Sequence, residues 1–126
     1  MVHGDVAFDT VRGGTIISTE EVMMAVAKTL QPSWLLLAGE TLGVLDQNGQ
    51  VILKITRESL PEIASVLGGS RGTDVTGGMA SKVNSMLQML IEQPQLNIRI
   101  FSGLNARQLQ TTLQNPQISS GTLLCN

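Results

Sequence analysis

The sequence of 126 residues predicts an α/β fold in which helices pack on a mainly parallel sheet. Helical patterns alternate with short apolar segments along the whole chain, which is the order expected for such a fold. One of these segments, residues 34–38 (WLLLA), is continuously apolar, as is typical of a strand buried on both faces of a parallel sheet. The length is sufficient for one small core, and no internal repeat or low-complexity linker divides the chain.

The composition limits the classes of function that the chain can serve. Hydrophobic residues make up 42% of the sequence and charged residues 14%, as in globular proteins. A net charge of −2 and an aromatic content of 2% offer neither an electrostatic attraction for nucleic acid nor a platform on which bases stack. The single cysteine, Cys125, fits a reducing cytoplasm, and neither a signal peptide nor a membrane-spanning run is visible. We therefore expect a cytoplasmic protein that binds neither nucleic acid nor membrane.

The first third of the chain predicts two short strands and a helix. Residues 6–8 and 15–17 are strand-like, and a glycine-rich turn separates them. Ser18 and Glu21 have the spacing of a capping box, in which each side chain bonds the other residue's backbone N–H. Apolar residues then recur every four positions until Pro32, which predicts a helix with one buried face.

The middle of the chain predicts a ligand-binding loop, a hairpin and a second helix. Residues 39–46 leave the predicted strand at its carboxyl end, where open α/β sheets bind ligands. Asn48 and Gly49 form the Asn-Gly pair that favours a tight hairpin turn. Thr56 or Ser59 caps the following helix, and two glycines at 68–69 end it in the manner of a left-handed cap.

The last third predicts a long helix, a strand, a short helix and a final strand. The long helix follows residue 78 and ends before Pro94, and residues 97–101 are strand-like. Asn105 caps the short helix, and residues 121–125 form a short strand at the edge of the sheet. The apolar side chains expected to point inward from the two helices are Met79, Val83, Met86, Leu87, Leu90, Ala106, Leu109 and Leu113.

Residues 68–82 (GGSRGTDVTGGMASK) have residue types that packing alone does not explain. Gly77 and Gly78 lead directly into the long helical pattern, and Lys82 lies one turn further on. Glycines let a backbone approach a ligand closely, and a helix N-terminus offers unpaired N–H groups and a positive dipole end to an anion. With the ammonium group of Lys82, the stretch can form a cradle for a polyphosphate. The alternative is a glycine-rich loop that only joins two helices, with Lys82 on the surface.

Several other kinds of site are excluded by residue counts. His3 is the only histidine and no Gly-x-Ser-x-Gly turn is present, so a Ser-His-Asp triad is not expected. One histidine and one cysteine cannot make a His/Cys metal site, and the glycine fingerprints of P-loop and dinucleotide-binding proteins are absent. Carboxylates near a polyphosphate usually hold Mg²⁺, and Asp5, Glu40, Asp46 and Asp74 are the candidates. Glu40 and Asp46 are equally well explained as solvated loop acids.

Five motifs follow one another along the chain, and together they identify a family. They are HGDVAFDTVRGGTIIS, LLLAGETLGVLD, GTDVTGGMASKV, IRIFSGL and GTLL. In this order they resemble the C-terminal, nucleotide-binding half of the amino-acid-kinase family, and in particular its isopentenyl phosphate kinase branch. The resemblance implies a three-layer αβα sandwich of the amino-acid-kinase or carbamate-kinase type. It also implies transfer of the γ-phosphoryl group of ATP, with Mg²⁺, to isopentenyl phosphate, which gives isopentenyl diphosphate and ADP.

The resemblance also assigns roles to particular residues. Asp5 would order the catalytic groups near the transferred phosphate, and Thr19 stands where relatives have a glycine that contacts the phosphate acceptor. Glu40 stands where the family commonly has an aspartate beside the nucleotide. The residues implied in ATP binding are Glu40, Gly43, Val44, Gly77, Gly78 and Lys82.

The resemblance further implies that residues 1–126 are one half of a kinase domain. Family members carry a Lys-x-Gly-Gly-Ser loop and an acceptor-binding histidine in an N-terminal half, and these motifs do not occur here. His3-Gly4-Asp5 has the residue types of a domain interior, so we expect the chain to begin within the domain. Pairing with the N-terminal half, or a homodimer, follows as an expectation, with little turnover by this chain alone. The alternatives are a non-catalytic nucleotide-binding or interaction module and a uridylate-kinase-like enzyme.

Overall fold

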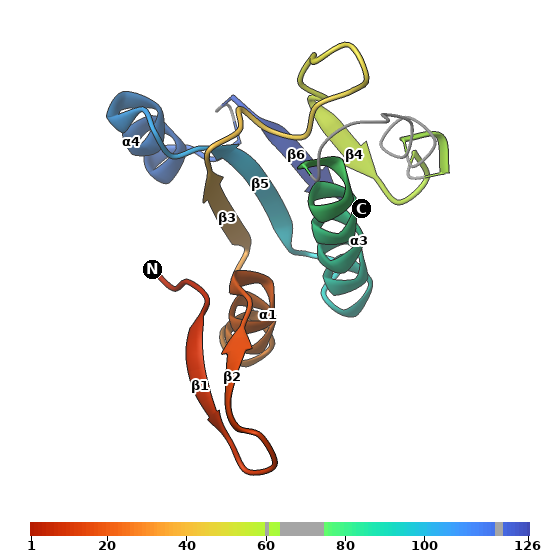
Figure 1. Ribbon diagram of the computed structural model, residues 1–126. Coiled ribbons are helices and arrows are strands. Elements are labelled where there is room, and N and C mark those ends of the chain that lie inside the picture. Colours follow the sequence, from red (N-terminus) through yellow and green to blue (C-terminus); the bar gives the residue numbers. More distant parts are fainter. Residues whose placement is uncertain (60, 64–74, 118–119) are drawn as a thin grey trace. The chain divides into compact units, whose positions relative to one another are not determined.

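The computed structural model describes residues 1–59, 61–63, 75–117 and 120–126. They form two compact units, Met1–Pro32 and Ser33–Asn126. The first unit contains a β-hairpin and a helix, and the described part of the second contains a four-stranded sheet flanked by helices (Figure 1). Within the described ranges, no helix is long and apolar enough to cross a membrane.

The first unit begins with the two predicted strands, which pair with each other. β1 (Asp5–Asp9) and β2 (Gly13–Ile17) form an antiparallel hairpin. The Asp9 carboxylate closes the turn, because its Oδ1 accepts hydrogen bonds from the backbone N–H groups of Val11 and Arg12 at 2.9 and 2.6 Å. The strand predictions for residues 6–8 and 15–17 are therefore confirmed, with strands slightly longer than expected.

The helix of the first unit, α1 (Thr19–Leu30), has the predicted capping box. Ser18 Oγ accepts a hydrogen bond from the Glu21 N–H at 3.2 Å, and the Glu21 carboxylate accepts one from the Ser18 N–H at 2.8 Å. The helix ends at Gln31, whose φ of 46° is left-handed, and Pro32 follows. Both ends of α1 are thus fixed by local side-chain and backbone chemistry that the sequence indicates.

The capping box gives a first testable prediction. We expect Ser18→Ala to lower the free energy of unfolding of α1 by about 1 kcal/mol, because an N-terminal N–H loses its side-chain acceptor. Urea unfolding followed by the helical circular dichroism signal measures the change. Ser81→Ala is the control, since this exposed residue within α3 (Val75–Glu92) gains helix propensity and should lose no stability. Equal effects of the two substitutions would contradict the role of Ser18.

The second unit is built on one mixed sheet with the strand order β3-β5-β6-β4. The strands are β3 (Trp34–Gly39), β4 (Lys54–Thr56), β5 (Asn97–Ser102) and β6 (Thr122–Cys125). β3 is parallel to β5 and β4 is parallel to β6, whereas β5 and β6 are antiparallel, so the mainly parallel sheet is confirmed. The prediction that the final strand lies at the edge is wrong, because β6 lies between β5 and β4.

The continuously apolar strand, β3, is less buried than its sequence predicts. Its parallel pairing with β5 is as expected, but only Leu37 is buried, and Ala38 and Gly39 are exposed. The physical reason is that β3 is an edge strand of the described sheet, with β5 as its one described neighbour. Of the two inner strands, β5 is the more buried, with five of its six residues buried.

A buried arginine lies in the middle of β5. Arg99 is 4% exposed, and its guanidinium donates hydrogen bonds to the carbonyl oxygens of Pro116 at 2.8 and 3.1 Å and of Gln117 at 3.0 Å. Removal from water lowers the pKa of Arg99 from its usual value. The alternation of apolar and polar residues in this strand therefore does not mark a solvent-facing side, because the polar residue is satisfied inside the protein.

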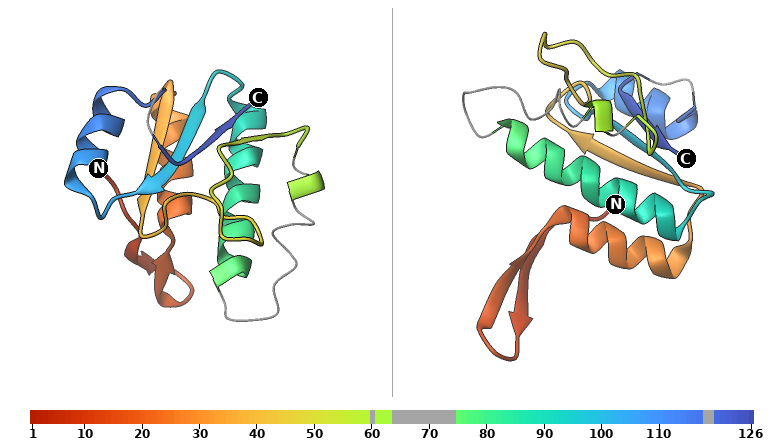
Figure 2. Two further views of the ribbon diagram at one scale, coloured as in Figure 1. Left: turned by 90° about the horizontal axis from the view of Figure 1, so that it is seen from above. Right: turned by 90° about the vertical axis from the view of Figure 1, so that its right-hand side faces the viewer.

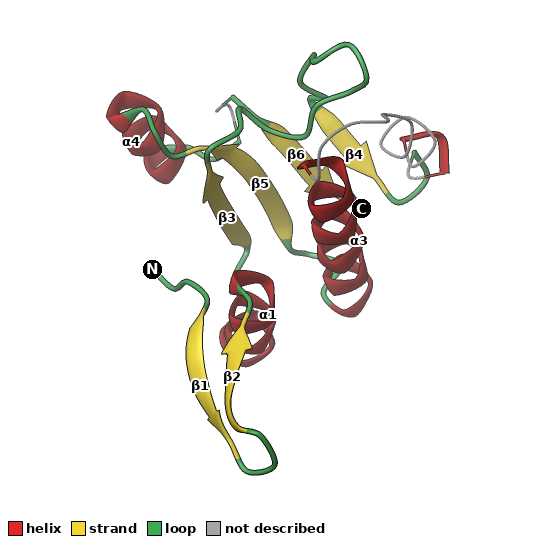
Figure 3. Cartoon of the chain, viewed as in Figure 1, coloured by secondary structure: helices red, strands yellow, loops and turns green. Residues whose placement is uncertain are grey.

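Helices α3 and α4 (Ala106–Gln114) of the second unit cover opposite faces of the sheet (Figures 2 and 3). The predicted three-layer arrangement is thus present in the second unit. The predicted stripe of α3 is buried at Val83, Met86, Leu87 and Leu90, and Met89 joins it.

The short helix α4 is capped as predicted but buries a different side. Asn105 Oδ1 accepts hydrogen bonds from the N–H groups of Arg107 and Gln108 at 3.0 and 3.2 Å. Ala106 and Leu113 are exposed, so the prediction that they point inward is wrong. Thr112 is fully buried instead, which is possible because its hydroxyl donates to the Gln108 carbonyl within the helix.

The predicted Asn-Gly turn is confirmed, although its strands are short. Gly49 has a φ of +76°, and the chain on either side is joined by a single antiparallel bridge between Leu45 and Val51. Asp46 Oδ1 accepts hydrogen bonds from the N–H groups of Asn48 and Gln50, both at 2.8 Å. Residues 61–63 begin the helix predicted after Ser59, and its predicted glycine end at 68–69 lies outside the described residues.

Candidate functional site

The segments that the sequence analysis singled out lie at one end of the sheet in the second unit, the end at which β3 and β5 terminate. The parallel strands β3 and β5 end there at Gly39 and Ser102, and the antiparallel β6 begins there at Thr122. Helix α3 leads into β5 through a short connection and therefore runs antiparallel to β5. Its N-terminal end lies on the side toward which β3 and β5 point (Figures 1 and 2). Loops and a helix N-terminus thus lie together at the carboxyl ends of β3 and β5, where α/β sheets bind ligands.

The sequence predicts a helix after residue 78, but α3 begins earlier, at Val75, so the glycine pair of the predicted phosphate cradle lies inside its first turn. Because the helix begins at Val75, the N–H groups of Val75, Thr76 and Gly77 have no carbonyl partner within the helix. Gly78 is exposed, and a Cβ atom added to it would meet nothing within 4 Å. The backbone is therefore open at the point where an anion would approach. Residues 64–74, which include Asp74 and the earlier glycines of this stretch, lie outside the described residues.

Lys82 lies one helical turn after Gly78 on the same face of α3. Its side chain is half-buried. Side chains of an α-helix lean toward its N-terminus, which brings a long side chain at this position toward the first turn. The positive charge and the N–H groups of the first turn can therefore act on the same anion.

The loop that follows β3 is held in place by a residue far away in sequence. Thr122, which is fully buried, accepts a hydrogen bond from the Val44 N–H at 2.8 Å through its Oγ1. The Val44 carbonyl accepts from the Ile52 N–H at 2.8 Å, and the Val44 side chain is also fully buried. A Cβ atom on Gly43 would lie 2.7 Å from Thr122 Oγ1, so only glycine fits there.

These contacts sharpen the expected roles of the loop residues. The backbone and side chain of Val44 are already engaged within the protein, so we expect it to act on a nucleotide only through the loop that it fixes. Gly43 likewise has a structural reason to be glycine. Glu40, directly after β3, is exposed and can face a ligand.

The anchor of this loop gives a second prediction. We expect Thr122→Val to lower the free energy of unfolding of the second unit by about 1–3 kcal/mol, because the buried Val44 N–H loses its acceptor. Urea unfolding followed by the fluorescence of Trp34, the only tryptophan, reports on this unit. Thr111→Val is the control, because this hydroxyl is exposed on α4 and bonds only within the helix. If Thr122→Val lowered the free energy of unfolding no more than Thr111→Val does, the hydrogen bond to Val44 would be unimportant for stability.

The other two candidates, Asp5 and Thr19, belong to the first unit. Thr19 Oγ1 accepts a hydrogen bond from the Gly4 N–H at 2.9 Å, which joins the start of the chain to the first turn of α1. A Cβ atom on Gly4 would lie 2.7 Å from the Thr19 nitrogen, so the glycine of the HGD motif is required by this close approach. Asp5 is exposed, and its Oδ1 accepts from the Val6 N–H at 2.7 Å. The structure therefore brings Asp5 and Thr19 together at the open end of the hairpin.

The described residues do not form a complete metal site, so a metal ion would have to bind together with a ligand. They contain no group of three or more His, Cys, Asp or Glu side chains placed to hold one. Asp46, one of the candidate carboxylates, uses its Oδ1 to close the 46–50 turn. Mg²⁺ usually binds through one or two carboxylates together with substrate phosphates, and the exposed Glu40 fits such a partial role.

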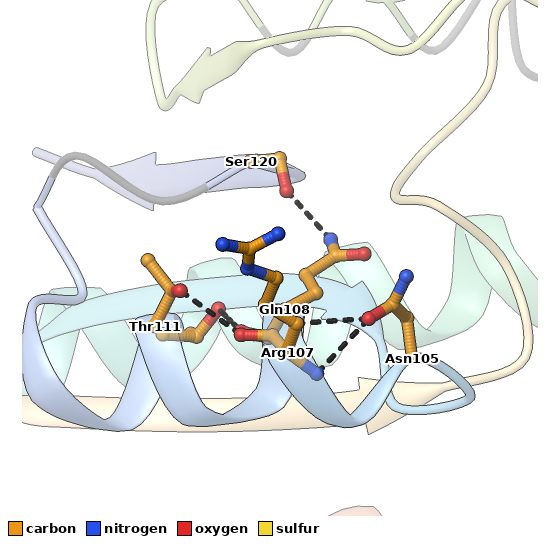
Figure 4. Close-up of a pocket in the computed structure, with 6 residues that line it drawn as sticks. Asn105, Arg107, Gln108, Thr111 and Ser120 are labelled. Atoms are coloured by element: carbon orange, nitrogen blue, oxygen red, sulfur yellow. Dashed lines mark hydrogen bonds between the residues drawn. The ribbon is translucent and has the colours of Figure 1, made fainter.

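An open pocket of about 290 Å³ lies beside α4 (Figure 4). No sequence signal indicated it, and none of the predicted site residues lines it. Several of its polar groups are already paired, since Asn105 caps the helix and Gln108 Nε2 donates to Ser120 Oγ at 2.6 Å. The lining residues are Asn105, Arg107, Gln108, Thr111, Thr112 and Ser120.

Comparison with known proteins places this arrangement in a family. Residues 1–102 match the model of the amino acid kinase family. The chain belongs to this family. It is 40% identical over 89 residues to the isopentenyl phosphate kinase of Haloferax volcanii and 30% identical over 113 residues to that of Methanocaldococcus jannaschii. These matches cover 71% and 90% of this chain but only 35% and 41% of the two relatives. The chain therefore spans less than half the length of the relatives that it matches.

Solved structures show the same fold. An isopentenyl phosphate kinase structure matches 97% of this chain with a TM-score of 0.65 and 18% identity, and the match covers 43% of that chain. A carbamate kinase from Giardia lamblia bound to AMP-PNP matches 89% of this chain with a TM-score of 0.61 and 18% identity, over 36% of that chain. The predicted αβα fold of the amino-acid-kinase or carbamate-kinase type is thereby confirmed.

Proposed function

We propose that this chain provides the nucleotide-binding half of an isopentenyl phosphate kinase. One observation carries the proposal: the first turn of α3 and the loop after β3 lie at the same end of the sheet. The names of the two relatives, at 40% and 30% identity, support isopentenyl phosphate as the acceptor. ATP is the phosphoryl donor in this proposal, and Mg²⁺ accompanies it.

In this proposal the phosphates of ATP bind at the N-terminal end of α3. The first-turn N–H groups, which have no carbonyl partner within the helix and include that of Gly77, donate to phosphate oxygens, and the open backbone at Gly78 lets the phosphates approach. Lys82 neutralises charge from one turn further along the helix. Glu40, Gly43 and Val44 belong to the loop that borders the nucleotide, and Thr122 keeps this loop in one conformation.

Asp5 and Thr19 serve the acceptor side in this proposal. Thr19 is the first residue of α1, so its backbone N–H is one of the unpaired groups that a helix N-terminus can offer to a phosphate. Its hydroxyl oxygen already accepts from Gly4, which holds the residue in place. Asp5, next to it at the start of β1, would orient the groups around the transferred phosphate.

The remaining contacts would come from the N-terminal half of the kinase fold. Phosphoryl transfer depends on positioning and on neutralising charge in the transition state. Loss of one preorganised donor typically raises a catalytic barrier by about 2.7–4 kcal/mol. We therefore expect the chain alone to bind Mg·ATP but to turn over negligibly.

The test combines two measurements on the full chain. Calorimetry with Mg·ATP should show binding to the chain alone. Addition of the amino-terminal portion of the Methanocaldococcus jannaschii relative, up to the matched stretch, should then produce ADP release that depends on isopentenyl phosphate and not on uridylate. Binding without turnover would favour a non-catalytic nucleotide-binding module. Turnover with uridylate would favour a uridylate-kinase-like enzyme, and the absence of Mg·ATP binding would contradict the proposal.

A further inference from the structure

Residues that can donate hydrogen bonds line the open pocket beside α4 (Figure 4). The guanidinium of Arg107, the amide of Gln108 and the hydroxyl of Ser120 lie on the same side of the helix. Among the described residues, none accepts a hydrogen bond from the guanidinium of Arg107, which carries several N–H donors and no acceptor. The pocket therefore contains a positive charge whose donors are available to a ligand.

Two further side chains of the pocket can donate to the same ligand. Gln108 Nε2 donates to Ser120 Oγ at 2.6 Å, so the hydroxyl hydrogen of Ser120 can point to another acceptor. Asn105 Oδ1 accepts from the N–H groups of Arg107 and Gln108, which leaves the Nδ2 group of Asn105 to donate. Because these two backbone N–H groups are already satisfied, a ligand would bind to side-chain donors and not to the helix terminus.

The part of the chain that forms the pocket carries positive charge only. Residues 93–126 contain no Asp or Glu, although the whole chain has a net charge of −2, and their only charged side chains are Arg99 and Arg107. The buried Arg99 donates to the carbonyl oxygens of Pro116 and Gln117, in the connection that leads from α4 to Ser120. None of the described carboxylates pairs with either arginine. The pocket is thus suited to an anion.

The pocket lies at the end of the sheet where β5 ends. Asn105 follows β5 closely in the chain, and Ser120 comes shortly before β6 begins. Ligands of α/β folds commonly bind at the carboxyl ends of strands. The lining residues belong to the α4 side of the sheet, whereas the phosphates of ATP are proposed to bind at α3, on the opposite face (Figure 2).

We propose that the pocket beside α4 binds a small phosphate, either inorganic phosphate or the phosphate group of a small ester. Arg107 would hold two phosphate oxygens with its planar guanidinium, and Ser120 and Asn105 would donate to the others. A volume of about 290 Å³ is at the lower limit of ligand pockets, which measure about 300–1,000 Å³, so the ligand is smaller than a nucleotide. This site is additional to the proposed nucleotide site, with which it shares no residue.

Amide NMR of the full chain, titrated with inorganic phosphate at constant ionic strength and without nucleotide, tests the proposal. The signals of Arg107, Gln108 and Ser120 should shift until they saturate. Glycerol phosphate should shift the same signals: tighter binding of this ester would identify an organic phosphate as the ligand, and equal or weaker binding would identify the free ion. Acetate, which has a single charge and a planar carboxylate, should bind at least about tenfold more weakly than phosphate.

Three variants separate a specific contact from a general effect of charge. Arg107→Gln should weaken phosphate binding by about tenfold or more, because a hydrogen bond between charged groups is lost. Ser120→Ala, which keeps the charge, should weaken binding by about two- to tenfold. Arg57→Gln is the matched control, because this exposed arginine does not line the pocket, and it should change the affinity by less than about twofold. Circular dichroism checks that each variant keeps the fold.

The outcomes that would overturn the proposal are distinct from those that bear on ATP binding. Equal losses for Arg107→Gln and Arg57→Gln would show that only net charge matters. Acetate binding as tight as phosphate binding, or pocket signals that do not saturate, would exclude a phosphate site. Phosphate-induced shifts at Gly77 and Gly78 with none in the pocket would overturn this proposal and leave the proposed nucleotide site intact.

Discussion

Gly121→Ala is expected to lower the free energy of unfolding of the second unit by about 3 kcal/mol or more. Gly121 is buried directly before β6 and has a φ of +99°, a conformation that costs other residues about 1–3 kcal/mol. In addition, a Cβ atom there would overlap the carbonyl oxygen of Ile100 and lie 2.9 Å from Phe101 Cβ in the inner strand β5. Both atoms belong to rigid parts of the core, so the backbone would have to shift.

A second glycine isolates the contribution of packing. Gly49 also has a positive φ, of +76°, but a Cβ atom on it would meet nothing within 4 Å. Gly49→Ala should therefore cost only about 1 kcal/mol, from backbone strain alone. Urea unfolding followed by Trp34 fluorescence measures both variants. A loss at position 121 no larger than the loss at position 49 would show that the close approach to Ile100 is unimportant. The loss expected for Gly121→Ala is large, since the free energy of unfolding of a whole domain is about 5–15 kcal/mol.

Lys82→Ala is expected to weaken Mg·ATP binding by about 10- to 100-fold. A hydrogen bond to a charged group contributes about 1.5–3 kcal/mol, and each 1.4 kcal/mol corresponds to about a tenfold change in affinity. Lys82 is one turn from the open backbone at Gly78, where the phosphates are proposed to bind. Calorimetric titration of the full chain with Mg·ATP measures the change directly.

Lys54 offers a matched control for the loss of one positive charge. It is exposed on the edge strand β4 and is not part of the proposed phosphate site on α3. Lys54→Ala should change Mg·ATP affinity by less than about twofold, because an exposed charge that does not contact the phosphates is screened by solvent and salt. If the two variants weakened binding equally, the effect would come from net charge and not from a contact of Lys82 with phosphate.

Features fixed by neighbouring residues could be predicted from the sequence. The capping box at Ser18 and Glu21, the cap at Asn105 and the turn at Gly49 each depend on side chains within a few positions. The buried stripe of α3 was also predictable, because its apolar residues recur at helical spacing on a helix with a fully covered face. Local chemistry decides all of these features.

Features that depend on distant pairing could not be predicted in the same way. The sequence of β6 does not reveal that it lies between β5 and β4, since strand order is decided by contacts over long separations. On α4, the buried residue is Thr112 and not Leu113, because the threonine hydroxyl is satisfied inside the helix.

The candidate site shows the same division between local and distant causes. The position of residues 39–44 after a strand, and of Gly77, Gly78 and Lys82 at the start of a helix, followed from residue patterns. Thr122, which anchors the loop, is 78 residues away from Val44 and carries no signal of this role in the sequence. The structure thereby shows that Thr122 holds the loop in place, which the sequence motifs do not indicate.

The most direct test of the account is to map where Mg·ATP binds on the full chain by amide NMR. If the phosphates bind at the N-terminal end of α3, the largest shift changes will fall on Gly77, Gly78 and Lys82, with smaller changes at Gly43 and Val44. The pocket beside α4, represented by Arg107, should remain unchanged. Shift changes concentrated at that pocket, with none at Gly77 and Gly78, would contradict the proposed nucleotide site.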